Sequence, residues 1–130
     1  RSGGPLIQPE LTDSKRAAEL AAEGHQAYRS GNLQEALNKY RKASKLDPSK
    51  AEYQINMGSL HFNQGNYEKA TSRYRRALSL NPDSAEAHLY LGATLLRTGD
   101  RSTARRHLKK AVDLNPENKQ AQRLLERTGN

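Results

Sequence analysis

Four histidines are the residues of this sequence with the broadest chemistry: His25, His61, His88 and His107. An imidazole can act as a general base or as a metal ligand. These four are dispersed one per segment and lack the spacing of a ligand pair. The sequence also has no cysteine, no phosphate-cradling glycine loop and no G-x-S-x-G turn. It therefore predicts no enzyme, no cofactor and no metal, and His88 is expected to pack between helices.

A second group of residues has the spacing of one helical face. Residues separated by three or four positions lie side by side on a helix, and an exposed apolar patch usually marks a binding surface. The residues on this face that we expect to bind are His25, Tyr28, Arg29, Ile55, Asn56, Ser59, Phe62, Asn63, Leu89, Tyr90, Leu96 and Arg97. Some of the apolar members can instead pack between helices or against the start of the chain. Asn56 is the strongest candidate, because its amide offers a donor and an acceptor to a peptide backbone.

Lysine and arginine gather on other predicted helices. The candidates for a basic outer face are Arg41, Lys42, Arg73, Arg75, Arg76, Arg105, Arg106 and Lys109. Cations alone suffice to contact phosphate, so nucleic acid or an anionic membrane is an alternative partner. Tyr40 and Tyr74 are expected in the core, so no platform for stacking bases is predicted. A solvated, non-binding helix face remains the simpler interpretation of these charges.

The elements that position these residues repeat every 34 positions. In residues 51–84 the pattern is Gly58, Gly65, Asn66, Ala70, Tyr74, Ala77, Leu80 and Pro82, and residues 17–50 and 85–118 repeat it in register. A period of this length is typical of a solenoid of helix pairs. Gly31, Gly65 and Gly99 are predicted to end the first helix of each pair. Asn32 should cap the next helix with Glu35 in a capping box. Asn66 and Asp100 should cap the second helix of their own pairs. Further candidate caps are Ser49, Ser84 and Asn118. Gly24, Gly58 and Gly92 are expected to let paired helices approach by facing Ala36, Ala70 and Ala104.

The chain resembles the tetratricopeptide repeat family over residues 17–118. The resemblance implies an all-α solenoid of three antiparallel helix pairs with a C-terminal solvating helix at 119–128. It also implies that the first helices of the pairs line a concave surface where extended peptides bind. The family's carboxylate clamp for heat-shock chaperone C-terminal peptides matches only at Asn56, since the other positions hold Ala21, His25, Glu86 and Tyr90. On this basis the sequence excludes that chaperone motif as a partner.

Composition limits the remaining possibilities. The net charge of +8 and the pI near 9.9 favour acidic partners. No apolar run is long enough to span a membrane and there is no signal peptide, so we expect a cytoplasmic protein. The chain begins with Arg1 instead of Met, so a native targeting segment can have been removed. Residues 1–12 are expected to be a flexible leader or an expression remnant, Asp13 or Ser14 should cap the first helix, and the repeat domain should occupy 13–130.

The sequence thus favours a non-catalytic scaffold or adaptor that binds a partner peptide or helix. Binding of nucleic acid or anionic membrane by the basic face, and self-association through the repeat array, are the alternatives.

Overall fold

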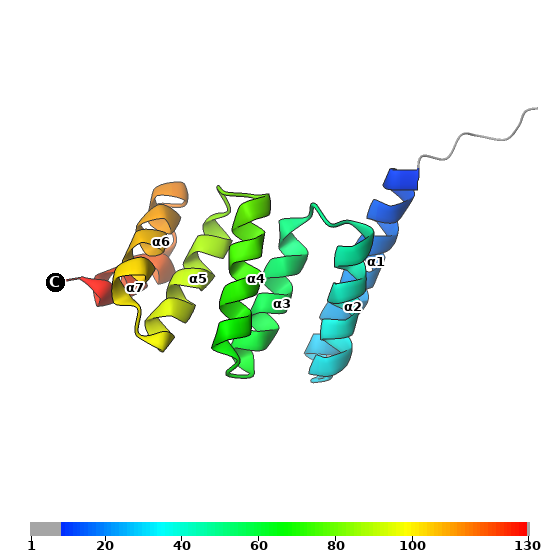
Figure 1. Ribbon diagram of the computed structural model, residues 1–130, viewed down its shortest axis with the longest axis horizontal. Coiled ribbons are helices and arrows are strands. Elements are labelled where there is room, and N and C mark those ends of the chain that lie inside the picture. The colour runs from blue at the N-terminus through cyan, green and yellow to red at the C-terminus, as the bar shows by residue number, and fades with distance from the viewer. Residues whose placement is uncertain (1–8, 130) are drawn as a thin grey trace, which may run out of the picture.

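The computed structural model describes residues 9–129, which form helices and no strand. The helices are α1 (Pro9–Arg29), α2 (Leu33–Leu46), α3 (Ala51–Asn63), α4 (Tyr67–Leu80), α5 (Ala85–Thr98), α6 (Arg101–Leu114) and α7 (Lys119–Thr128). In Figure 1 the helices follow one another in a row in chain order, from α1 and α2, which overlap in this view, to α6 and α7 at the other end. The predicted all-α solenoid is confirmed.

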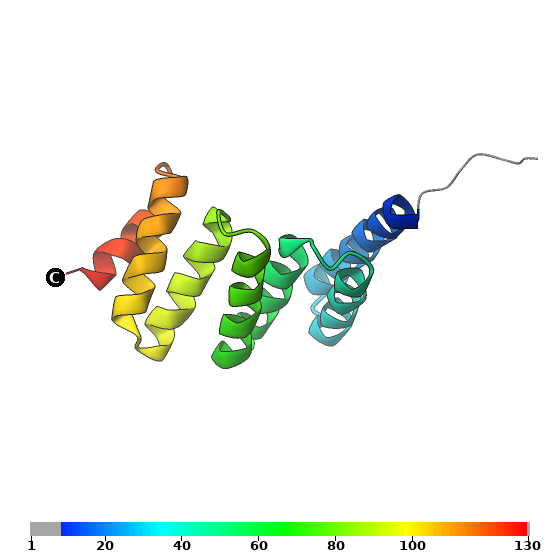
Figure 2. The ribbon, with the colours of Figure 1, turned by 45° about the horizontal axis from the view of Figure 1, so that its top comes forward.

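Consecutive helices form the packing units. α1 packs against α2, α3 against α4 and α5 against α6, while α2 meets α3 and α4 meets α5 between the pairs. α7 packs on α6 and also contacts α5, at the red end of the row in Figure 2. The largest fully buried side chains are Tyr53, Met57, Tyr74, Leu91 and Leu108. A long, thin core of this kind forms between repeats, so a low apolar content suffices to fold the chain.

The turns inside the pairs follow the predicted glycines. Gly31, Gly65 and Gly99 have φ values of 82°, 79° and 93°. This left-handed conformation is strained for residues with a Cβ, which explains why glycine recurs at each of these turns.

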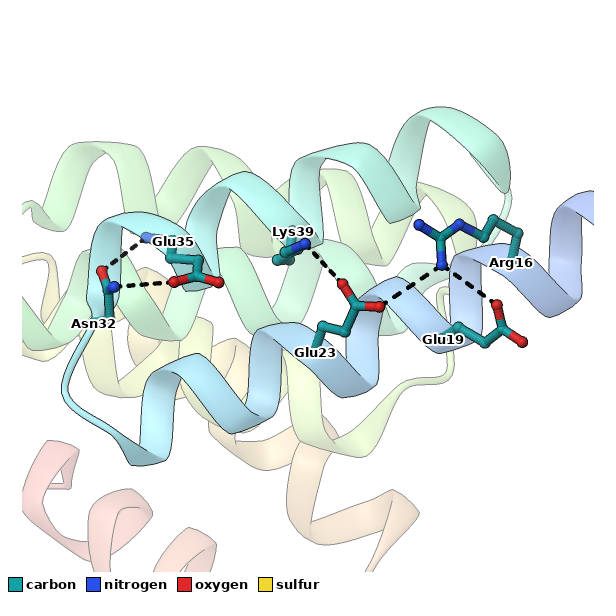
Figure 3. A network of polar contacts seen from close by, with 6 residues as sticks. All are labelled: Arg16, Glu19, Glu23, Asn32, Glu35 and Lys39. Atoms are coloured by element: carbon teal, nitrogen blue, oxygen red, sulfur yellow. Dashed lines mark hydrogen bonds and ion pairs between the residues drawn. The ribbon is translucent and has the colours of Figure 1, made fainter.

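The helix caps differ more between repeats than the sequence predicts. The Asn32 side chain accepts a hydrogen bond from the Glu35 backbone N–H, and its amide donates to Glu35 Oε1 at 3.0 Å (Figure 3). The side chains of Ser84, Asp100 and Asn118 also cap their helices. Asn66 makes no side-chain cap bond, and Lys50 takes the cap position expected for Ser49.

The start of α1 also differs from the prediction. The helix begins at Pro9 instead of after Asp13 or Ser14, so residues 9–12 of the expected leader are helical. Proline is favoured in the first turn of a helix, where its missing N–H costs no hydrogen bond. Residues 1–8 of the expected leader lie outside the described part of the chain.

The glycines inside the first helices have a different partner from the one predicted. A Cβ on Gly24 would lie 2.7 Å from Tyr40 Cε1, and a Cβ on Gly58 would lie 2.7 Å from Tyr74 Cε1. The glycine therefore makes room for the aromatic ring on the second helix, which points back along that helix towards its N-terminus. Gly92 faces Leu108 and also approaches an expected alanine, at the carbonyl oxygen of Ala104.

Carboxylates on α1 are neutralised within the first helix pair. Glu23 accepts a bond from Lys39 Nζ at 2.7 Å and lies 3.7 Å from Arg16, which also meets Glu19 at 3.4 Å (Figure 3). The hydrogen bond and charge of Lys39 lower the pKa of Glu23. Exposed pairs of this kind add little stability. Glu19 and Glu23 thus find their partners within the first helix pair.

Candidate functional site

Three adjoining pockets run across the first helices of the pairs, and we call them the pocket row. The first, about 160 Å³, is lined by His25, Tyr28, Tyr40, Asn56, Ser59 and Leu60. The second, about 270 Å³, is lined by Ser59, Phe62, Asn63, Tyr74, Tyr90, Ala93 and Gln120. The third, about 210 Å³, is lined by Phe62, Ala93, Leu96, Arg97, Gln120, Leu124 and Arg127. Neighbouring pockets share lining residues, so the row is continuous from α1 through α3 and α5 to α7.

Asn56 contributes an unused hydrogen-bond donor to the first pocket. Its Nδ2 is buried and has no partner among the described residues. Leaving a buried amide donor unpaired costs about 1–3 kcal/mol, so such groups call for an explanation. Asn56 also lines the first pocket, so an unpaired amide belongs to a residue of its wall. A donor of this kind suits a carbonyl or carboxylate oxygen.

The other polar groups of the first pocket already have partners. Tyr40 Oη lies 2.6 Å from His25 Nδ1, and Asn63 Nδ2 donates to Tyr28 Oη at 2.7 Å. Burial raises the pKa of Tyr40, so its hydroxyl stays protonated. Tyr28 is 43% exposed, which is unusual for so large an apolar surface in this chain. The pocket therefore combines one free amide donor with an accessible aromatic ring.

Tyrosines form the floor of the second pocket. Tyr74 Oη lies 3.0 Å from Ser59 Oγ, and burial raises the pKa of Tyr74 to about 12. The rings of Tyr74 and Tyr90 lie 5.9 Å apart, and Tyr90 Oη donates to Glu86 Oε2 at 3.5 Å. Burial, with a contribution from Glu86, also raises the pKa of Tyr90. Both hydroxyls therefore remain neutral at physiological pH.

Arg97, which lines the third pocket, packs on two aromatic rings. Its guanidinium lies 5.6 Å from the ring centre of Phe62 and 5.7 Å from that of Tyr67. It also donates to Tyr67 Oη at 3.0 Å. Stacking on aromatic faces fixes a guanidinium without neutralising it. Arg97 and Arg127 therefore give this end of the pocket row a positive charge next to an apolar surface formed by Phe62, Leu96 and Leu124.

Nine of the twelve predicted binding residues line the pocket row: His25, Tyr28, Asn56, Ser59, Phe62, Asn63, Tyr90, Leu96 and Arg97. Ile55 and Leu89 do not, because they are only 6% and 3% exposed and pack between helices in the core. The prediction that these two offer apolar contact to a ligand is corrected accordingly. Arg29 is exposed, donates to Gln26 and lies outside the lining.

Sequence reasoning missed the contribution of α7. Gln120, Leu124 and Arg127 line the pocket row, whereas this helix was expected only to solvate the end of the array. The apolar pair Leu124 and Leu125 in a polar segment was the available signal. Tyr40 and Tyr74 were placed in the core, which the structure confirms, but their edges also reach the pockets.

The histidines are less dispersed than the sequence suggests. His88 and His107 stack with ring centres 5.3 Å apart, and their Nδ1 atoms are 3.0 Å apart. His88 Nε2 also meets the carbonyl oxygen of Pro82 at 2.8 Å, so this residue packs between helices as predicted. No group of three or more metal-ligating side chains occurs among the described side chains, those of residues 12–129.

A repeated helix pair with a ligand-sized row of pockets defines the chain as a helical-repeat scaffold. The family pattern described as "Tetratricopeptide repeat" matches residues 61–128, more than half of the chain, and a second pattern described as "TPR repeat" matches residues 24–65. The chain belongs to the tetratricopeptide repeat family, a family of protein-interaction repeats.

Solved structures agree with this fold. The first TPR domain of Spaghetti (RPAP3), bound to the HSP90 peptide SRMEEVD, superposes with a TM-score of 0.85 at 24% identity, covering 88% of this chain and 91% of that one. The Arabidopsis OM64 TPR domain gives 0.84 at 21% identity, covering 90% and 97%. The second TPR domain of human RPAP3, in complex with the HSP70 peptide SGPTIEEVD, gives 0.81 at 19% identity, covering 93% and 98%. No curated protein matches the chain in sequence.

These neighbours correct one prediction. The sequence analysis excluded heat-shock chaperone C-terminal peptides as partners because only one of five clamp positions matched. Two domains of the same fold are bound to such peptides, so the exclusion is wrong.

Among the described residues, no helix has the length and apolar character needed to cross a membrane.

Proposed function

We propose that this chain is a non-catalytic binding module that holds an extended, acidic peptide segment of a partner protein in the pocket row. The unpaired Nδ2 of Asn56 is the observation that carries the proposal. A peptide oxygen would satisfy this donor whatever the side chains of the peptide are, which suits recognition of an extended backbone.

The charge of the pocket row favours an acidic ligand. Arg97 and Arg127 line one end, and the whole chain carries +8. Glu86, which accepts a hydrogen bond from Tyr90, is negatively charged and would repel the carboxylates of a ligand. An acidic peptide should therefore place its carboxylates towards α7. Phe62, Leu96 and Leu124 would accept an apolar side chain beside them. Peptides such as SRMEEVD combine carboxylates with apolar residues, and they are therefore the first probes to use.

Binding of a labelled SRMEEVD peptide, followed by fluorescence anisotropy, tests the proposal. Asn56→Ala should weaken binding at least about tenfold, since a hydrogen bond to a charged group is worth about 1.5–3 kcal/mol and each 1.4 kcal/mol is about a factor of ten. Asn38→Ala is the matched control, because Asn38 is exposed on α2 and lines no part of the pocket row. Equal affinity of the two variants would contradict the proposal, as would failure of every acidic peptide in a panel that includes SRMEEVD.

A peptide with an amidated C-terminus separates two modes of recognition. If Asn56 bonds the backbone within the peptide, amidation should change the affinity little. If it bonds the terminal carboxylate, amidation and Asn56→Ala should weaken binding to the same extent, and their effects should not add.

A further inference from the structure

A second cleft lies between α2 and α4, with α3 as its floor. It has a volume of about 740 Å³, and five cations line it: Arg41, Lys45, Lys69, Arg73 and Arg76. We call it the basic cleft. All of its lining residues belong to α2, α3 and α4. None of them also lines the pocket row. Any ligand of the basic cleft is therefore separate from the peptide proposed above.

The charges of the basic cleft are not balanced by the protein. No carboxylate is among the described residues that line it, and none of its five cations forms an ion pair with a described side chain of residues 12–129. Arg73 is half-buried and donates only to Gln54 Oε1, at 3.2 Å. Holding like charges together in one concave site is unfavourable unless a counter-charge joins them.

The floor of the basic cleft contains a polar group without a partner. His61 is 7% exposed, and its Nδ1 makes no hydrogen bond with any described residue. Burial, followed by the charges of Arg73, Lys69 and Arg41, lowers the pKa of His61. The residues around this imidazole on α2 and α4 are thus cationic, and an anion in the cleft would meet both a ring nitrogen and the guanidinium groups.

The next repeat differs from the basic cleft at two lining positions. One period further on, Leu78 stands in place of Ser44 and Leu95 in place of His61. Leu95 is buried, and Leu78 packs against the core. Two polar lining positions of the basic cleft are thus apolar at the corresponding place between the second and third repeats. The polar lining of the basic cleft is therefore not repeated there.

We infer that the basic cleft binds a small, multiply phosphorylated molecule through Arg41, Arg73 and Arg76, with Lys45 and Lys69 at its sides and His61 as a donor from the floor. Arginine matches phosphate oxygens in a bidentate geometry, and several phosphates on one ligand would neutralise several cations at once. The volume is in the range of ligand sites. No phenylalanine, tyrosine or tryptophan is among the described lining residues, so the cleft offers no stacking surface for a nucleobase.

Calorimetric titration with inositol hexakisphosphate tests the inference, with inorganic phosphate as the weak comparison. The wild-type chain should bind one molecule, and NMR should show the pKa of the His61 imidazole rising when the ligand is bound. Arg41→Gln combined with Arg73→Gln should weaken binding at least about tenfold, as expected for the loss of charge-assisted hydrogen bonds. Arg106→Gln combined with Lys109→Gln is the control, because it removes the same charge from exposed positions of α6 outside the cleft.

Two further measurements distinguish binding in the basic cleft from general surface electrostatics, and a membrane ligand from a soluble one. Ser44→Leu combined with His61→Leu copies the residues of the next repeat, keeps every cation and should abolish binding. Vesicles that contain a phosphatidylinositol bisphosphate, compared with free headgroup, separate a membrane source from a soluble one. Binding that the leucine variant retains, or that the α6 control loses equally, would overturn the inference in favour of general surface electrostatics. The SRMEEVD affinity of the leucine variant should stay at the wild-type value, so this test is independent of the pocket row.

Discussion

Replacement of Gly58 by alanine tests the way in which the paired helices fit together. A Cβ at this position would lie 2.7, 2.9 and 3.0 Å from Cε1, Cδ1 and Cζ of Tyr74. The ring cannot retreat easily, because Tyr74 is almost fully buried, its hydroxyl meets Ser59 and its face meets Tyr90. Overpacking of a tight contact costs about 1–3 kcal/mol.

A second effect of Gly58→Ala acts in the opposite direction. Alanine is a better helix former than glycine by about 0.5–1 kcal/mol. The overpacking term is the larger, so the variant should lose about 0.5–2 kcal/mol in its free energy of unfolding. Its Tm should fall by roughly 3–8 °C. Urea unfolding followed by circular dichroism at the helical band measures the change directly.

A double-mutant cycle separates the two effects. In a Tyr74→Ala background the ring is absent and only helix propensity remains, so Gly58→Ala should become neutral or stabilising. An equal loss in both backgrounds, or a single variant as stable as wild type, would refute the packing assigned to the glycine.

Three other outcomes follow from the structure. Burial, with contributions from His88 and two arginines, lowers the pKa of His107 to about 4. When the pH falls, the unfolded chain therefore protonates this imidazole near pH 6.5, whereas the folded chain does so only near pH 4. The free energy of unfolding should therefore fall across this interval by about 1–2 kcal/mol after solvent screening, and His107→Gln, compared in pH-dependent melts, should lose less. Gly99→Ala, at a φ of 93° with open space around it, should cost about 1 kcal/mol in urea unfolding through backbone strain alone, and no loss would contradict that cause. Raising the salt concentration should weaken inositol hexakisphosphate binding far more steeply than SRMEEVD binding, and equal slopes would count against two separate sites.

The 34-residue period was sufficient to predict the solenoid and most of the pocket row. The period predicts best at positions where the backbone conformation restricts the residue type, such as Gly31 and Gly65 at a positive φ. Residues such as Asn56 and Phe62 could be placed on the correct helix face because the face follows from helical spacing alone.

Other features depend on three-dimensional detail that the period does not contain. Ile55 and Leu89 share the spacing of the ligand-facing residues, but both side chains are buried in the core between helices. Gln120 reaches the pockets only because α7 folds back against α5 as well as α6. The basic cleft brings together side chains of α2, α3 and α4, and a pattern of charges along the chain cannot show where packed helices leave space.

Mapping of a bound acidic peptide by NMR tests the central claim most directly. With SRMEEVD added to the isotopically labelled chain, the account predicts perturbed signals for residues of the pocket row, above all the side-chain amide of Asn56 and the backbone amides of Ser59, Ala93 and Gln120. Residues that line the basic cleft should stay unperturbed. Perturbations confined to α2 and α4, with the Asn56 amide unchanged, would contradict the account and place peptide binding on the basic face instead.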